Sequence, residues 1–192
     1  NAYGRVTSIL ISFQRFERAK VAARRRIEID ERNVSEDPDN AELRLQLAIS
    51  LGVLTTVETR GGEHAESQAH LRHAIGILTQ FSPSEIAETS PLYSWAMGRG
   101  YNNMGINSLK IGNLDEAEVS QHRAVRFMTR AISESPSDNT DLDVYKQNLV
   151  MIEINLGEVL HLRGKRADAA RVSREALEHG LRFSVESSDS IT

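Results

Sequence analysis

Hydrophobic positions recur every three to four residues through almost the whole chain, which is the spacing of amphipathic helices. The first apolar stripe extends from Val6 to Ile27 and dissolves into the polar run at residues 36–40. It predicts one leading helix within residues 1–35. Similar stripes predict further helices from near Asn40, over residues 63–81, from Pro91 to Ile111, from Asn113 to about residue 135, and over residues 141–163 and 166–183. The polar segment 82–84 is expected to be a break, so the pattern predicts an all-α protein of about seven helices.

A set of small residues and one asparagine returns at a fixed distance along the chain. The first set is Asn103, Gly105, Gly112, Ala117 and Ala124, and each member recurs 52 residues later, at Asn155, Gly157, Gly164, Ala169 and Ala176. A looser copy upstream consists of Ser50, Gly52, Gly62, Ser67 and Ala74. A fixed period is typical of stacked-repeat architectures. We therefore expect repeats at residues 40–82, 90–135 and 140–183, a partial or degenerate repeat at 1–35, and a flexible tail at 184–192.

Two of the repeated glycines fall in the middle of predicted helices. A glycine there costs about 1 kcal/mol relative to alanine. Gly105 and Gly157 therefore indicate a place where the partner helix of each hairpin approaches too closely for a side chain.

The repeated residues resemble the tetratricopeptide repeat (TPR). The resemblance rests on Asn-Leu/Met-Gly followed by one glycine and two alanines, and on the segment 113–118, and it covers roughly residues 41–182. Gln121 and Ser173 stand where that family carries an aromatic residue, and the period of 52 exceeds the usual repeat of about 34 residues. Such extended repeats are similar to those of kinesin light chains and of arrays attached to some bacterial serine/threonine kinases. The resemblance implies a right-handed α-solenoid of antiparallel helix hairpins.

Composition and charge narrow the possible functions. The net charge of −4 argues against nucleic-acid binding through bulk positive charge. There is no cysteine, no apolar stretch long enough to insert into a membrane, and no catalytic motif. His70 and His73 lie three residues apart, but no carboxylate–histidine pattern joins them, so no metal site is expected. We expect a non-enzymatic protein without a cofactor, part of a larger bacterial cytoplasmic signalling protein associated with a kinase.

The resemblance also indicates which residues line the inner groove of the stack. In the first repeat these are Gln46, Ile49, Ser50, Val53 and Val57; in the second Arg99, Asn102, Asn103, Ile106, Leu109 and Lys110; and in the third Met151, Ile154, Asn155, Glu158 and Leu162. An asparagine both donates and accepts hydrogen bonds, so it can pair with a peptide backbone of any sequence. The alternative is that Asn103 and Asn155 form hydrogen bonds inside the stack and maintain its geometry.

Three functions remain compatible with these observations. The first is a scaffold or regulatory module that binds a protein or peptide segment in the groove. The second is homo-oligomerisation, since a repeat array without polar caps exposes an apolar end. The third is a regulatory domain that senses a small molecule, which would require a pocket rather than an open groove.

Overall fold

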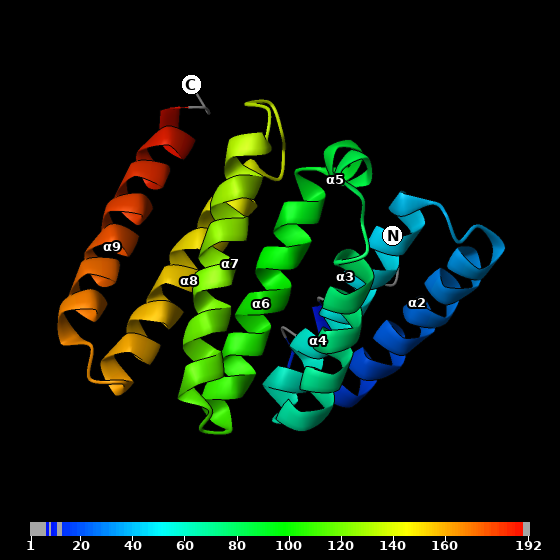
Figure 1. Ribbon diagram of the computed structural model, residues 1–192, viewed down its shortest axis with the longest axis horizontal. Coiled ribbons are helices and arrows are strands. Elements are labelled where there is room, and N and C mark those ends of the chain that lie inside the picture. Colours follow the sequence, from blue (N-terminus) through cyan, green and yellow to red (C-terminus); the bar gives the residue numbers. More distant parts are fainter. Residues whose placement is uncertain (1–6, 8, 11–12, 190–192) are drawn as a thin grey trace. The chain divides into compact units, whose positions relative to one another are not determined.

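A computed structural model describes residues 7, 9, 10 and 13–189, and every element labelled in this part of the chain is an α-helix (Figure 1). There are eight labelled helices in these residues: α2 (Phe16–Glu36), α3 (Ala41–Gly61), α4 (His64–Leu78), α5 (Pro83–Thr89), α6 (Leu92–Lys110), α7 (Leu114–Glu134), α8 (Leu142–Leu162) and α9 (Arg166–Asp189). Consecutive long helices pack as antiparallel pairs, so the predicted all-α hairpin architecture is confirmed and is consistent with a TPR-like repeat. The helices form two compact units, one of α2–α5 and one of α6–α9.

The first unit is built around α3, which packs against α2, α4 and the short α5. Leu45 and Leu54 on α3 and Leu71 on α4 are almost completely buried in its core. A polar contact ties α3 to α2, where the Ser50 hydroxyl donates a hydrogen bond to the buried carboxylate of Asp30. An ion pair between Arg44 and Glu85 holds α5 against α3.

Two features of the first unit differ from the sequence-based expectation. The leading helix, expected within residues 1–35, is interrupted: residues 7, 9 and 10 are helical, and α2 begins at Phe16 after a turn in which Gln14 has a positive φ of 55°. Val6, which opened the predicted stripe, lies outside the described residues. The short helix α5 lies where a break was expected and accounts for the eighth labelled helix of the described residues.

A capping box explains why α5 forms. The Ser82 backbone N–H donates to Glu85 Oε2 at 2.7 Å, and the Glu85 N–H donates back to Ser82 Oγ at 3.3 Å. Pro83 occupies the first helical position, where its missing N–H and fixed φ are favourable. The segment 82–85 is therefore a helix start, although its proline and serines resemble a loop.

The three hairpins share one turn. Gly62, Gly112 and Gly164 each follow a long helix with φ of 86°, 82° and 76°, a conformation that residues with a side chain rarely adopt. In every case the next residue's N–H bonds the carbonyl five positions back, at 2.8–2.9 Å. This is the Schellman pattern that ends helices at a left-handed glycine. A left-handed glycine therefore ends the first helix of each hairpin.

In the second unit, α7 packs against both α6 and α8, and α9 packs against α8 (Figure 1). Val125 on α7 contacts the buried cluster of the following hairpin, formed by Leu156, Leu160, Ala169 and Val172. Ion pairs between side chains connect the turn between α8 and α9 to the start of α7. Arg163 bridges Asp115 at 2.6 Å and Glu118 at 3.1 Å, and Lys165 reaches Glu118 at 2.7 Å.

The mid-helix glycines of the second unit mark close contacts between helices. A Cβ on Gly105 would lie 2.6–2.9 Å from the side chain of Gln121, and one on Gly157 would lie 3.0 Å from Ser173 Oγ. These two partners are 52 residues apart and occupy the positions where a TPR carries its aromatic residue. Gly52 differs, because no atom lies within 4 Å of a Cβ placed there. The close approach therefore occurs in the second and third repeats and not in the first.

The last helix is longer than expected. We expected a flexible tail from residue 184, but α9 continues to Asp189, and residues 190–192 lie outside the described residues. An ion pair between Lys146 on α8 and Glu186 on α9, at 2.7 Å, connects this additional turn to the unit.

Candidate functional site

Most of the predicted groove residues of the second unit fall into two matching rows, which Trp95 and Gln147 extend by one position each. The row on α6 consists of Trp95, Arg99, Asn102, Ile106 and Lys110, and the row on α8 consists of Gln147, Met151, Ile154, Glu158 and Leu162. Each member of the second row lies 52 residues after its counterpart in the first. The two helices contact each other directly as well as through α7. We call the surface formed by these ten residues the α6–α8 face.

The α8 row is strongly exposed although it is largely apolar. Met151, Ile154 and Leu162 are 57%, 58% and 54% exposed. A single exposed hydrophobic residue is ordinary, but three on one face of a helix form a patch of the kind found at interaction sites. Glu158 is the one charged member of this row and is also exposed.

The α6 row is more polar and less exposed. The Arg99 guanidinium lies 4.9 Å from the centre of the Trp95 ring, and that ring lies 6.1 Å from the ring of Tyr145 on α8. Lys110 is exposed at the C-terminal end of α6, and Ile106 is half-buried. Trp95 was not among the residues we selected from the sequence, although it lies one helical turn before Arg99 on the same side of the helix.

Asn102 of the α6 row bonds to Asn155, the residue that follows Ile154 on α8. Asn155 Nδ2 donates to Asn102 Oδ1 at 2.9 Å, which joins α8 to α6. Asn103 also has an interaction partner. The Asn102–Asn155 bond supports the alternative that asparagines maintain the geometry of the stack, since it uses one donor and one acceptor of the pair.

Ser50 is buried and hydrogen-bonded within the first unit. It is 1% exposed and donates its hydroxyl hydrogen bond to Asp30. A buried hydroxyl with this partner cannot reach a ligand on the surface, so Ser50 is not part of the α6–α8 face.

A buried carboxylate–imidazole pair lies between α8 and α9. Both carboxylate oxygens of Glu153, a residue only 4% exposed, are 2.9 Å from His179 Nδ1. The equivalent residues one repeat earlier, Tyr101 and Phe127, are stacked rings with centres 5.8 Å apart. Burial raises the pKa of the Glu153 carboxyl above its ordinary value, and the hydrogen bond with His179 partly opposes this rise. At equivalent positions, the second hairpin thus has two stacked aromatic rings and the third has a titratable carboxylate–imidazole pair.

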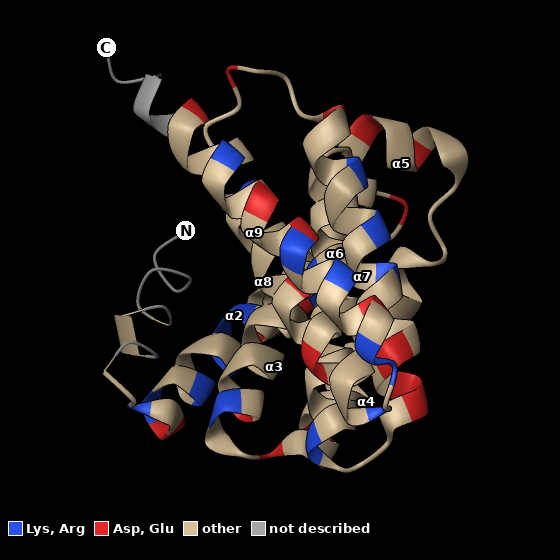
Figure 2. Ribbon diagram, turned by 90° about the vertical axis from the view of Figure 1, so that its left-hand side faces the viewer, with Lys and Arg blue, Asp and Glu red and all other residues tan. Residues whose placement is uncertain are grey.

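Charge and metal-ligand chemistry give no second candidate surface. Blue and red segments are interspersed along the helices, so acidic and basic residues are not segregated (Figure 2). Within the described part of the chain, no three histidine, cysteine or carboxylate side chains come together as a metal site would require. No helix among the described residues combines the length and the apolar character needed to cross a bilayer.

Comparison with known proteins yields a weak structural likeness. No family model matches the chain, and no curated protein matches its sequence. The crystal structure of BtubC (BKLC) from P. vanneervenii is similar at 15% sequence identity, with 88% of this chain and 92% of that chain covered and a TM-score of 0.32. A TM-score of 0.32 supports no conclusion about the function of this chain.

Proposed function

We propose that this chain is a protein-interaction module that binds an extended segment or a helix of a partner on the α6–α8 face. The observation that carries the proposal is the exposed apolar row of Met151, Ile154 and Leu162 on α8. Burying such side chains against a partner contributes about 25 cal/mol for each Å² of apolar area removed from water. The wider role expected from the sequence, as a regulatory part of a bacterial cytoplasmic signalling protein, stays a prediction.

Polar groups beside the apolar row would give orientation to a bound segment. After Asn155 has donated to Asn102, the pair retains an amide donor on Asn102 and an amide oxygen acceptor on Asn155. These groups can pair with a peptide backbone. Glu158 and Lys110 are exposed at one end of the face, where they can select the charge of the partner.

The double substitution Met151→Glu and Ile154→Glu tests this proposal. Both side chains are more than half exposed, so the variant is expected to keep the wild-type melting temperature. Peptides selected from a displayed library against the intact chain are expected to bind this variant at least tenfold more weakly, because two carboxylates would then face the apolar part of the ligand. Binding is measured by isothermal titration calorimetry.

A matched control is Leu177→Glu with Leu181→Glu on α9. These residues are 63% and 60% exposed and lie outside the α6–α8 face. The control is expected to bind the selected peptides as the wild type does. Equal binding by wild type and by the Met151 and Ile154 variant would exclude the α6–α8 face as the binding surface.

A second candidate function is self-association through the outer side of α9. Leu177, Leu181 and Val185 form a stripe spaced by four residues, and each is at least 60% exposed. Leu177 lies 52 residues after Val125, which packs against the next hairpin within the second unit. The position that holds successive hairpins together is therefore repeated on the last helix with nothing among the described residues to cover it.

If α9 mediates self-association, sedimentation equilibrium of the wild type will show a dimer that dissociates on dilution. The Leu177→Glu and Leu181→Glu variant will then be monomeric at every concentration, because burying these carboxylates at the interface is unfavourable. A wild-type monomer at all concentrations would rule out this second function and leave the first unaffected.

A further inference from the structure

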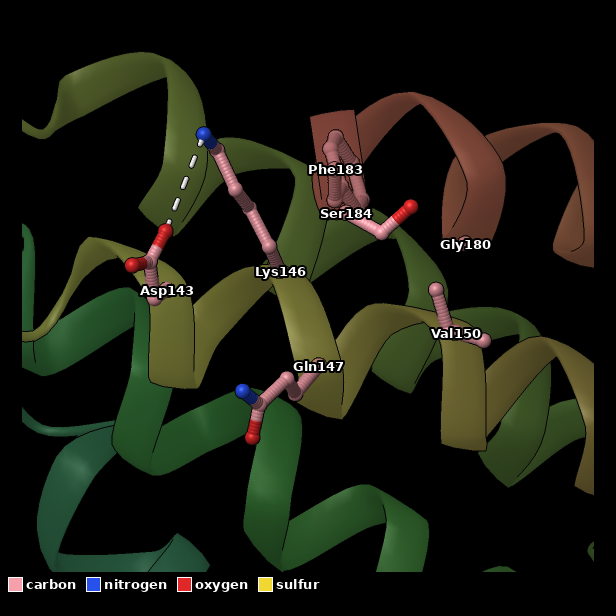
Figure 3. Close-up of a pocket in the computed structure, with 7 residues that line it drawn as sticks. All are labelled: Asp143, Lys146, Gln147, Val150, Gly180, Phe183 and Ser184. Carbon is pink, nitrogen blue, oxygen red and sulfur yellow. Dashed lines mark ion pairs between the residues drawn. The ribbon is translucent and has the colours of Figure 1, made fainter. Parts of the chain in front are cut away.

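The end of the third hairpin contains a cleft between α8 and α9. It has a volume of about 470 Å³ and is lined by Asp143, Lys146, Gln147, Val150, Gly180, Phe183 and Ser184. Figure 3 shows Val150 of α8 pointing toward α9 near Gly180, with Asp143 and Lys146 farther along α8. This volume falls within the usual range for sites that bind small molecules.

The corresponding space in the second hairpin is filled by a methionine. Val150 and Gly180 lie 52 residues after Gly98 and Met128. Met128 is fully buried, and its terminal methyl carbon lies 3.1 Å from the position of a Cβ on Gly98. In the third hairpin the glycine is on the other helix, and a Cβ on Gly180 would be 3.9 Å from Val150 Cγ1. The cleft therefore results from these side chains and is not a general property of the hairpin.

The remaining contacts at this end of the hairpin follow the repeat closely. Ser94 Oγ donates to Glu134 Oε2 at 2.8 Å in the second hairpin, and at the equivalent place Lys146 Nζ donates to Glu186 Oε2 at 2.7 Å. The carboxylate thus joins the two helices in both hairpins. The helices are held together beyond the cleft, so a ligand would meet a preformed site.

The charged groups around the cleft already have partners. Lys146 pairs with Glu186 and, more loosely, with Asp143 at 4.0 Å. The Arg182 guanidinium lies 5.0 Å from the centre of the Phe183 ring, and the Ser184 hydroxyl donates to the Leu181 carbonyl. A charged ligand would have to break one of these contacts, whereas an uncharged apolar ligand would pack on Val150 and Phe183 without doing so.

We propose that the cleft between α8 and α9 binds a small, neutral, aromatic or branched aliphatic molecule in the space that Met128 fills in the second hairpin. The cleft shares Gln147 with the α6–α8 face, but its other lining residues lie outside that face, and the proposal does not depend on the function of that face. The third function considered from the sequence, the sensing of a small molecule, would use this cleft.

Indole serves as the probe, followed by heteronuclear NMR on the whole chain. Indole is expected to shift the amide resonances of Val150, Gly180 and Phe183 in a saturable manner. Its charged analogues, indole-3-acetate and tryptamine, are expected to bind more weakly. The absence of shifts at these residues, or tighter binding by either charged analogue, would overturn the proposal.

Gly180→Met should close the cleft as Met128 closes its counterpart. The variant is expected to bind indole at least tenfold more weakly and to melt no lower than the wild type, since a helical glycine with no neighbour nearer than 3.9 Å is replaced. Ala170→Met, at an exposed position on the same helix, is the control and should bind as the wild type does. Val150→Phe fills the cleft from α8 and should also weaken binding. Unchanged affinity in both filled variants would overturn the proposal.

Discussion

His179→Phe is expected to lower the free energy of unfolding by about 1–3 kcal/mol at neutral pH, because it removes the hydrogen-bond partner of a buried carboxylate. Glu153 is 4% exposed, and both of its carboxylate oxygens face His179 at 2.9 Å. Phenylalanine can preserve the stacking of position 179 on Phe183, whose ring centre lies 5.6 Å away. The expected loss is therefore assigned to the carboxylate and not to a cavity.

Adding Glu153→Tyr to this variant should recover most of the stability. The double variant recreates the Tyr101–Phe127 stack of the preceding repeat at the equivalent positions. Replacing both partners of a buried hydrogen bond by packed groups of similar shape can be nearly neutral or stabilising. In the second repeat the guanidinium of Arg123 lies near the Tyr101 hydroxyl, and the equivalent of Arg123 is Glu175, whose carboxylate can accept a hydrogen bond from a tyrosine at position 153.

The pH dependence of the free energy of unfolding tests whether the Glu153 carboxylate causes the loss of stability in His179→Phe. A carboxyl whose pKa is higher in the folded protein than in the unfolded chain binds protons preferentially in the folded state, so stability falls as the pH rises through that interval. Removing His179 removes the interaction that opposes the rise in the Glu153 pKa. Urea unfolding should therefore show that His179→Phe has a lower free energy of unfolding than the wild type. This deficit should be largest at neutral pH and should shrink as Glu153 is protonated. A deficit that is equal at every pH would assign the loss to packing.

Gly105→Leu is expected to destabilise the protein by about 1–3 kcal/mol through overpacking. Even the first added carbon would lie 2.6 Å from Gln121 Nε2 and 2.9 Å from its Cγ. Gln121 is 1% exposed and donates from Nε2 to the Asn102 carbonyl at 3.2 Å, so it cannot move aside without losing this bond. Thermal and urea unfolding measure the effect.

Alanine at two equivalent positions supplies the matched control. Gly105→Ala should destabilise, whereas Gly52→Ala should be neutral or stabilise by up to about 1 kcal/mol, since no atom lies within 4 Å of its added Cβ. Truncating the neighbour with Gln121→Ala should relieve the clash, so the double variant should lose less than the two single losses together. Equal effects of alanine at positions 52 and 105 would contradict the close approach seen at Gly105.

Helix ends and turns are the features that local sequence specifies most completely. Asn113 accepts a hydrogen bond from the Glu116 N–H at 3.2 Å and donates to its carboxylate at 3.1 Å, as its position before an apolar stripe predicts. Gly112 occupies the left-handed position of the turn that ends α6, a conformation that favours glycine. Both depend on residues within a few positions of each other. The α5 helix was missed although the same kind of signal, Ser82 with Glu85, is present.

The sequence by itself determined that the chain folds into helical hairpins with a 52-residue period, because helical periodicity, caps and left-handed glycine turns are local properties. Only the tertiary structure decided what equivalent positions do. A Cβ on Gly105 would clash with Gln121, whereas one on Gly52 would meet no atom within 4 Å. Asn155 pairs with Asn102, whereas Ser50 is buried against Asp30. A repeated residue receives its neighbours from other helices, and those neighbours differ between repeats. The exposed row on α8 and the cleft beside Gly180 arise from these differences.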